Sequence, residues 1–162
     1  MHNTMKNLII LMLTALAVGL GSCSRLKCRN MDCGNGTCEK GECICDDGYE
    51  GASCQDLSRD KYLGIYTGTE ECSVQGTSTV GVVVDEGYND LSILFENLFN
   101  TNSEIQATMS GSSFTIPLQT NYAGNVIFNV VGSGHFSGNQ LVVNYTVEED
   151  GESESCSVTL SR

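Results

Sequence analysis

The sequence contains no tryptophan, a single proline and few basic residues, with 8 lysines and arginines against 20 aspartates and glutamates. A surface this negative repels nucleic acid and anionic lipid headgroups, so we expect neither as a partner. The acidic surplus is typical of a surface that keeps a protein soluble. One proline beside 18 glycines favours short strands joined by tight turns over helices.

Hydrophobic runs long enough to span a bilayer as a helix are also missing. The longest apolar stretch runs from Leu8 to Leu20, whereas a spanning helix needs about 20 residues. Lys6 precedes this stretch, and no acidic residue does. A short basic start followed by an apolar run of this length predicts a secretory signal peptide over residues 1–22.

The end of that stretch, Leu20-Gly21-Ser22-Cys23, resembles the lipobox of bacterial lipoproteins. The resemblance implies cleavage before Cys23 and acyl chains such as palmitate on that cysteine, with residues 23–27 as a tether. Two or more acyl chains hold a protein stably on a membrane. Ser24 is not the aspartate that retains many such lipoproteins in the inner membrane, so the resemblance implies anchoring in the outer membrane of the cell envelope. Whether the protein would face the periplasm or the cell surface is left open. An ordinary signal peptide with an incidental cysteine is the alternative.

The chain has only 2 histidines, and loss of the signal peptide would leave only His135. A catalytic triad needs a serine in a nucleophile elbow and an acidic residue that orients the histidine, and no such motif is found. Glycine-rich phosphate loops and basic aromatic patches are missing as well. Adjacent acids such as Glu70 and Glu71 would point to opposite faces of a strand, so they make poor acid/base partners. We therefore expect no enzyme and no cofactor.

Cysteine, by contrast, is abundant: 9 residues in a chain this short indicate an oxidising compartment. The odd number is explained if Cys23 carries lipid. Six cysteines lie within residues 28–54 with the spacing C-x4-C-x4-C-x4-C-x-C-x8-C, which by itself allows many pairings. No histidine accompanies them and residues 24–27 offer no carboxylate, so we expect neither a zinc nor a calcium site.

The spacing resembles the compact EGF-like modules of bacterial surface lipoproteins. The glycines of Gly34-Asn35-Gly36 and of Gly48-Tyr49-Glu50-Gly51 fit the resemblance too. A unit this small cannot bury a sufficient core, so disulfide bonds must stabilise it. Gly36 and Gly51 are expected in positive-φ turns. The bridges that the resemblance implies are Cys28–Cys38, Cys33–Cys43 and Cys45–Cys54.

After a polar linker at residues 55–60, the sequence alternates between apolar and polar residues with the period of half-buried strands. Glycine, asparagine and aspartate, including Gly132-Ser133-Gly134, mark the expected turns between strands. Residues 61–162 are therefore predicted to form an antiparallel β-barrel or a β-sandwich, which makes the chain all-β. Strands are expected near residues 62–71, 79–85, 91–95, 104–109, 113–118, 125–131, 141–147 and 156–160.

Two cysteines remain in this second domain. Cys72 ends the first strand region and Cys156 begins the last, so a bridge between them would place the first and last strands side by side, as barrel closure requires. The alternatives are two free thiols or bridges between chains. The arrangement is similar to the small β domains that follow EGF-like modules in bacterial lipoproteins, a resemblance that implies architecture and no activity.

These observations predict a lipid-anchored, non-enzymatic envelope protein, used in binding, adhesion or structure, whose EGF-like module is a spacer. The contact surface is expected on turn loops with Tyr88, Tyr122 and His135, beside an acidic hairpin tip at residues 148–154, and the partner is an unknown protein or glycan. A carrier that holds a small ligand inside the β domain is the alternative, and a hydrolase built on His135 ranks last. The sequence leaves the partner, the membrane face and the oligomeric state open.

Overall fold

The structure is a computed structural model that describes residues 27–162. The expected signal peptide, the lipobox and Cys23 lie outside these residues. The chain divides into two compact units that meet between Gln55 and Asp56, and each is described by itself. Over residues 27–162, none of the helical segments has the length and apolarity needed to cross a membrane.

The first unit is a small β structure held together by cystines. Strands β1 (Gly36–Glu39) and β2 (Glu42–Cys45) pair antiparallel, and β3 (Tyr49–Glu50) follows. Of its described residues, only Cys33 and Cys54 are buried, so the cystines take the place of an apolar core. The bridges join Cys28 to Cys38, Cys33 to Cys43 and Cys45 to Cys54, the pairs that the EGF-like resemblance implies.

Two glycines in this unit serve different purposes. Gly51 has a φ of 89°, as expected for a turn glycine. The expectation is wrong for Gly36, which lies in β1 rather than in a positive-φ turn. A Cβ on Gly36 would lie 2.5 Å from the Ile44 carbonyl oxygen and 2.9 Å from the Cys54 sulfur. Close approach of the neighbouring chain therefore requires this glycine.

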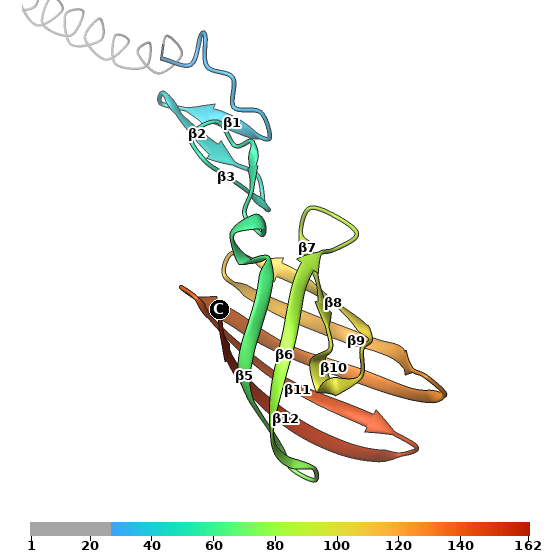
Figure 1. Ribbon diagram of the computed structural model, residues 1–162. Helices are drawn as coiled ribbons and strands as arrows, with labels where there is room; N and C mark the ends of the chain where they lie inside the picture. The colour runs from blue at the N-terminus through green and yellow to red at the C-terminus, as the bar shows by residue number, and fades with distance from the viewer. Residues whose placement is uncertain (1–26) are drawn as a thin grey trace, which may run out of the picture. The chain divides into compact units, whose positions relative to one another are not determined.

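The second unit is a closed barrel of eight antiparallel strands (Figure 1). Each strand pairs with the next along the chain, and β12 pairs with β5 to close the ring. The barrel, and not the sandwich, is therefore the correct one of the two predicted folds. Before it lie β4 (Asp56–Leu57) and a 3-10 helix, η2 (Asp60–Tyr62). The barrel strands are β5 (Gly64–Cys72), β6 (Gly76–Glu86), β7 (Ser92–Glu96), β8 (Glu104–Ser110), β9 (Ser113–Ala123), β10 (Val126–Ser137), β11 (Gln140–Glu149) and β12 (Glu152–Ser161), with the 3-10 helix η3 (Leu98–Asn100) between β7 and β8.

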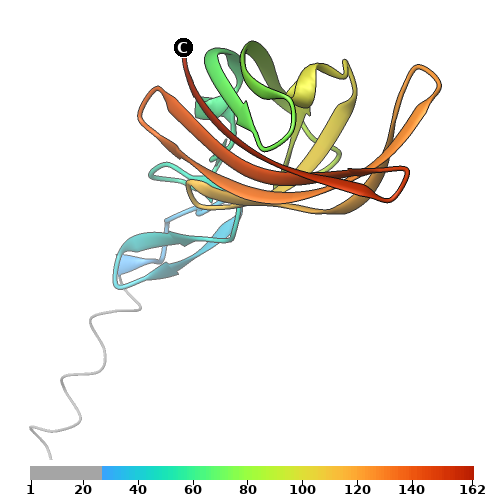
Figure 2. The ribbon, with the colours of Figure 1, turned by 90° about the horizontal axis from the view of Figure 1, so that it is seen from below.

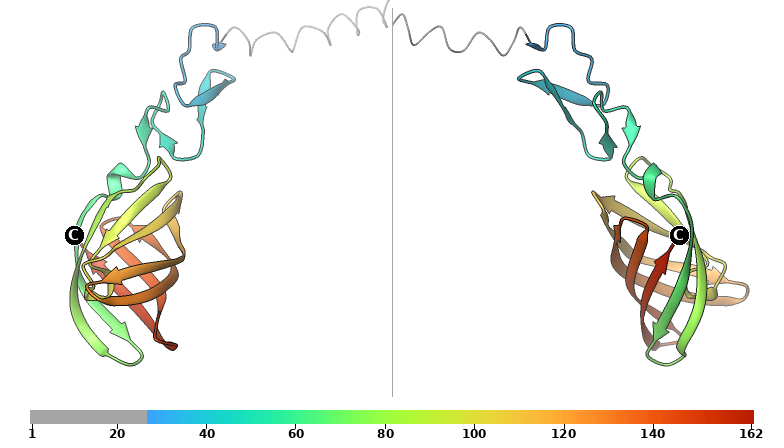
Figure 3. Two further views of the ribbon diagram at one scale, coloured as in Figure 1. Left: turned by 90° about the vertical axis from the view of Figure 1, so that its right-hand side faces the viewer. Right: turned by 60° about the vertical axis from the view of Figure 1, so that its left-hand side comes forward.

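A disulfide crosses the seam where the barrel closes. Cys72 on β5 lies directly opposite Cys156 on β12 in the strand register, and the two are bonded. Both are buried within the core. The bridge thus links the first and last strands of the barrel, which pair with each other and lie side by side in the right-hand view of Figure 3.

Aromatic rings pack together within the barrel, and the alternation along each strand turns the phenylalanines inward. Phe114 lies 5.0 Å from Phe95 and 5.5 Å from Phe136, measured between ring centroids. Phe136 in turn stacks on Tyr62 at 4.3 Å. Valine, leucine or isoleucine from β6 to β12 complete the same cluster, while β5 contributes Tyr66 and Cys72. In small barrels the interior is filled by side chains in this way.

The predicted turn at Gly132-Ser133-Gly134 is wrong, because these residues lie inside β10 and pair with both β9 and β11. The glycines serve packing instead. A Cβ on Gly132 would lie 2.6 Å from the Cβ of Tyr145, and one on Gly134 would lie 2.4 Å from the ring of Phe114. Glycine at these positions makes room for two large side chains within the barrel.

The predicted linker at residues 55–60 also needs correction, since it belongs to the second unit from Asp56 onward. Arg59 is only 5% exposed. Its guanidinium donates hydrogen bonds to the carbonyl oxygens of Asn89 and, at 3.1 Å, Ser92, and lies 3.6 Å from the Glu86 carboxylate. The polar composition of the segment predicts a linker, but this arginine fastens the segment to the β6–β7 connection.

Candidate binding surface

The barrel interior offers one buried polar pair. Glu70 on β5 is 3% exposed, and its Oε1 accepts a hydrogen bond from the Tyr145 hydroxyl of β11 and one from the Phe99 amide at 3.3 Å. Burial, and then the hydrogen bond to Glu70 and the charge of that carboxylate, raise the pKa of Tyr145 far above its ordinary value of 10.0. The pair is a satisfied internal contact, because each buried group has found a partner.

The raised pKa of Tyr145 predicts an alkaline loss of stability. From about pH 10 upward the unfolded chain loses the phenolic proton while the folded protein keeps it, so the free energy of unfolding falls by up to about 1.4 kcal/mol per pH unit. Tyr145→Phe is expected to reduce this slope in urea unfolding measured at a series of pH values. Part of the slope should remain in this variant, because burial also raises the pKa of Tyr66.

The matched control is Tyr122→Phe, which removes the hydroxyl of an exposed tyrosine. It should leave the alkaline slope unchanged. Equal slopes for the wild type and both variants would contradict the assignment to Tyr145.

An end hollow of about 360 Å³ lies where the β11–β12 and β5–β6 turns approach η3. Its apolar part comes from Val74, Phe99 and Val147. One of its carboxylates, Glu154, accepts hydrogen bonds from the amides of Val74 at 2.9 Å and Gln75 at 2.6 Å, so it caps the β5–β6 turn. The acidic residues that line this end hollow are Glu149, Asp150, Glu152 and Glu154.

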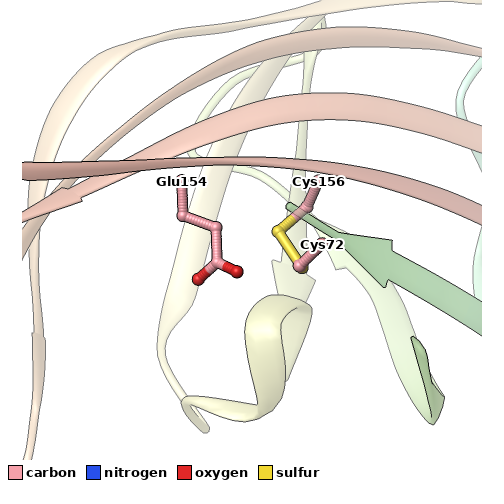
Figure 4. A group of neighbouring side chains, drawn as sticks. All are labelled: Cys72, Glu154 and Cys156. Carbon is pink, nitrogen blue, oxygen red and sulfur yellow. A yellow bond between two sulfur atoms is a disulfide. The ribbon is translucent and has the colours of Figure 1, made fainter. Parts of the chain in front are cut away.

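Glu154 also lies beside the disulfide of the seam (Figure 4). Potential ligand atoms of Cys72, Glu154 and Cys156 all lie within 4.8 Å of one another. Metal coordination by cysteine uses the thiolate, and these two sulfurs are bonded to each other. The group is therefore a structural bridge with a turn-capping carboxylate.

The outer face of β9 and β10 carries four exposed apolar or aromatic side chains, which we call the apolar strip: Leu118, Tyr122, Ile127 and Val131. Their exposed fractions are 71%, 65%, 57% and 43%. Tyr122 lies directly opposite Ile127 in the register. Farther along, the register shifts between Val130 and Gly132, so that Pro117 and Leu118 together face Val131. Such a β-bulge redirects side chains, and it turns Leu118 outward although Phe114 and Ile116 point inward.

Acidic side chains flank the apolar strip on both sides. On the β8 side, Asn121 donates a hydrogen bond of 2.6 Å to the carbonyl oxygen of Glu104, whose side chain is exposed. On the β11 side, exposed Glu148 lies opposite Asn129, which itself accepts a hydrogen bond of 2.8 Å from Thr120 within the strip. Between residues 63 and 161 the sequence has no lysine or arginine, so no basic side chain of the barrel wall offsets these charges.

The wall beside the apolar strip is hollowed. Figure 2 shows β10, β11 and β12 together in one curved wall. An open wall hollow of about 650 Å³ runs across it from Val131 to Glu71 on β5. Between them lie the polar side chains of Asn144, Thr146 and Ser157. The wall hollow thus continues the apolar strip with hydrogen-bonding groups and one more carboxylate.

The three predicted contact residues were expected on turn loops, but only Tyr88 lies in one, since Tyr122 is in β9 and His135 is in β10. The Tyr88 hydroxyl lies 3.3 Å from Oε2 of Glu104, and Tyr122 belongs to the strip itself, its carbonyl accepting a hydrogen bond from Ser103. His135 is exposed farther along β10, opposite Ser113 and Val142. Since neither neighbour is acidic, the register gives this histidine no orienting carboxylate.

Sequence reasoning missed Leu118, Ile127 and Val131. A signal for two of them was present, because Ile127-Phe128 and Val130-Val131 are neighbouring apolar pairs. Successive strand residues point to opposite faces, so one member of each pair must lie outside. Leu118 carried no such signal, since its outward position depends on the bulge.

No family model, curated protein sequence or solved structure matches the chain. What the structure defines is a general class: a disulfide-rich N-terminal unit followed by a closed eight-stranded antiparallel barrel.

Proposed function

We propose that the chain is a lipid-anchored, non-enzymatic binding protein of the bacterial cell envelope. In this proposal the lipid on Cys23 holds it at the outer membrane, the EGF-like module is a spacer, and the barrel binds a protein partner through the apolar strip. Adhesion to another cell and assembly within the envelope are both uses of such a protein.

The observation that carries the proposal is the apolar strip. Its side chains form two exposed groups on two paired strands, with Tyr122 opposite Ile127, Leu118 at the bulge beside Val131, and the polar pair Thr120 and Asn129 between them. Grouped exposed apolar surface with a polar rim marks sites of interaction, and tyrosine is enriched in the centres of protein interfaces. Other exposed apolar residues of the barrel, such as Ile65, are isolated. The residue opposite Ile65 on the paired strand β6 is Val83, which is less exposed than the residues of the apolar strip.

The alternatives find less support in the same observations. A carrier would need space within the barrel, where rings and aliphatic side chains fill the interior. A hydrolase would need an oriented His135, whose register neighbours are serine and valine. The outer wall is where exposed apolar surface and open hollows coincide.

The test is site-specific photo-cross-linking in intact cells. With a photoreactive side chain in place of Ile127, we expect a discrete product of higher mass that contains one partner. The same side chain in place of Ile65, which is as exposed and lies on β5, is the matched control and should give no such product. Equal products from both positions, or none from Ile127, would contradict the proposal.

The anchor is tested separately in the same cells. Cys23→Ala removes the only thiol available to the lipobox and should move the protein from the membrane pellet to the soluble fraction. A protein that stays in the pellet would show that the anchor is wrong, while the cross-linking result would still report on binding.

A further inference from the structure

From the charges around the apolar strip we infer that its partner is a protein segment with apolar side chains flanked by lysine or arginine. The inference rests on the proposed function and adds the chemistry of the partner, whose charge must complement the acidic surroundings of the strip.

Acidic groups lie on both sides of the strip. Glu104 and its register partner Glu96 lie on the β8 and β7 side of the strip, and Glu148 lies on the β11 side. Charged groups at the rim of an interface select the sign of the partner and steer its approach. A segment that places apolar side chains on the strip brings its own flanking side chains to these carboxylates, and only basic ones are attracted there.

Basic side chains are absent from the strands and turns of the barrel. No lysine or arginine occurs between residues 63 and 161, so no basic side chain of these strands and turns competes with the partner for Glu104 and Glu148. The end hollow adds further acids at the β11–β12 turn, adjacent in the chain to Glu148. The summed field of such a surface concentrates cations near it.

A second copy of this chain is disfavoured as the occupant. Two copies joined through their strips would bring Glu104, Glu148 and the acidic β11–β12 turn of one against acidic groups of the other. Like charges that meet across an interface repel and weaken it. Acidic glycans and anionic surfaces are disfavoured by the same repulsion.

The tyrosines and the wall hollow fit a basic segment. A lysine or arginine head group is attracted to the face of an aromatic ring, and Tyr88 and Tyr122 are both exposed. The wall hollow offers oxygen acceptors from Asn144, Thr146 and Ser157, with Glu71 at its far edge. Guanidinium and ammonium groups only donate hydrogen bonds, so they pair with these acceptors.

The test measures the binding of short synthetic peptides to the full-length chain with Cys23→Ser, which leaves no cysteine for lipid attachment. The probe is a peptide of alternating leucine and lysine, and the matched probe replaces each lysine by glutamate. We expect the lysine peptide to bind at least about tenfold more tightly at low salt, and the preference to shrink as salt is added.

Three variants separate the apolar contribution from the electrostatic one. Tyr122→Ser with Ile127→Ser should weaken the lysine peptide about tenfold, in line with the loss of interface anchors. Glu104→Gln with Glu148→Gln should remove most of the preference for lysine over glutamate while leaving the strip intact. Ile65→Ser, the control, should change neither value.

The outcomes distinguish this inference from the proposed function. Equal binding of both peptides that is lost with Tyr122→Ser and Ile127→Ser overturns the basic partner and leaves the binding strip standing. Failure of both peptides to bind, while Ile127 still cross-links in cells, also overturns the basic partner alone. Reversible dimerisation in sedimentation analysis that disappears in the strip variant would identify a second copy as the occupant. Competition by a neutral oligosaccharide, with no effect of salt, would identify a glycan.

Discussion

Removal of the seam disulfide is expected to cost the barrel about 4.5 kcal/mol of unfolding free energy. Cys72 and Cys156 are 84 residues apart in the sequence, so the bond prevents a long segment of the unfolded chain from separating at its ends, and the loss of that constraint has about this size in the chain-entropy description. The variant is Cys72→Ser with Cys156→Ser, because either change alone would leave a buried unpaired thiol. Urea unfolding followed by circular dichroism measures the change.

The control for this result is Cys45→Ser with Cys54→Ser in the first unit, whose bridge spans 9 residues. Its shorter loop and its place in a separate unit predict an unchanged unfolding midpoint for the barrel. A seam variant that loses less than about 1 kcal/mol would show that the unfolded chain already holds these strands together, since residual structure reduces the effect of a cross-link.

A single methyl group at Gly134 is expected to destabilise the barrel by about 3 kcal/mol or more, at the upper end of overpacking effects. The Cβ of Gly134→Ala would lie 2.2 Å from the Val142 carbonyl oxygen and 2.4 Å from the ring of Phe114. One of these atoms is backbone and the other belongs to a buried ring, so neither can move without disturbing the sheet or the core. The measurement is the urea midpoint.

Gly81→Ala is the matched control for Gly134→Ala. Gly81 lies on β6, and the nearest atom to its new Cβ is Cγ2 of Thr67 at 3.8 Å. The added methyl group therefore meets no clash, and the smaller freedom of the unfolded chain should raise stability by about 0.5 kcal/mol. If both alanine variants unfold at the same urea concentration, the assignment of a packing role to Gly134 is wrong.

The alternation of apolar and polar residues was enough to predict the strands and their order in the chain. Each of the eight predicted strand regions overlaps one of the strands β5 to β12, although β9, β10 and β12 are longer than predicted, and the fold class is confirmed. Alternation records only which face of a strand is buried, so it could not tell a barrel from a sandwich. That choice is made by the pairing of β12 with β5.

The errors have a common physical cause, which is that a residue type does not reveal its partners. Gly132 and Gly134 resembled a turn because glycine favours turns, yet here Tyr145 and Phe114 occupy the space of their missing side chains. Arg59 resembled a linker residue because it is polar, yet the Asn89 and Ser92 carbonyl groups hold it within the unit. Both outcomes depend on contacts far along the chain.

The candidate site could be predicted only in part for the same reason. The sequence predicts Tyr88 and Tyr122 as contact residues. In the structure the Tyr88 hydroxyl lies beside Glu104, and Tyr122 is part of the apolar strip. Leu118 depends on the bulge at Val131, and the flanking role of Glu104 and Glu148 depends on which strands are neighbours. Register of this kind follows from the assembled barrel.

The lack of lysine and arginine between residues 63 and 161 also determines how a protease meets this protein. Trypsin cleaves after basic residues, so it has no target anywhere on the strands and turns of the barrel from β5 to β12, whether these are folded or not. The barrel would be released after Lys61 as one undivided piece with its disulfide inside. Surface digestion of cells therefore needs an enzyme that cuts at acidic or aromatic residues, and mass spectrometry that relies on short tryptic peptides would record the first unit and overlook the second.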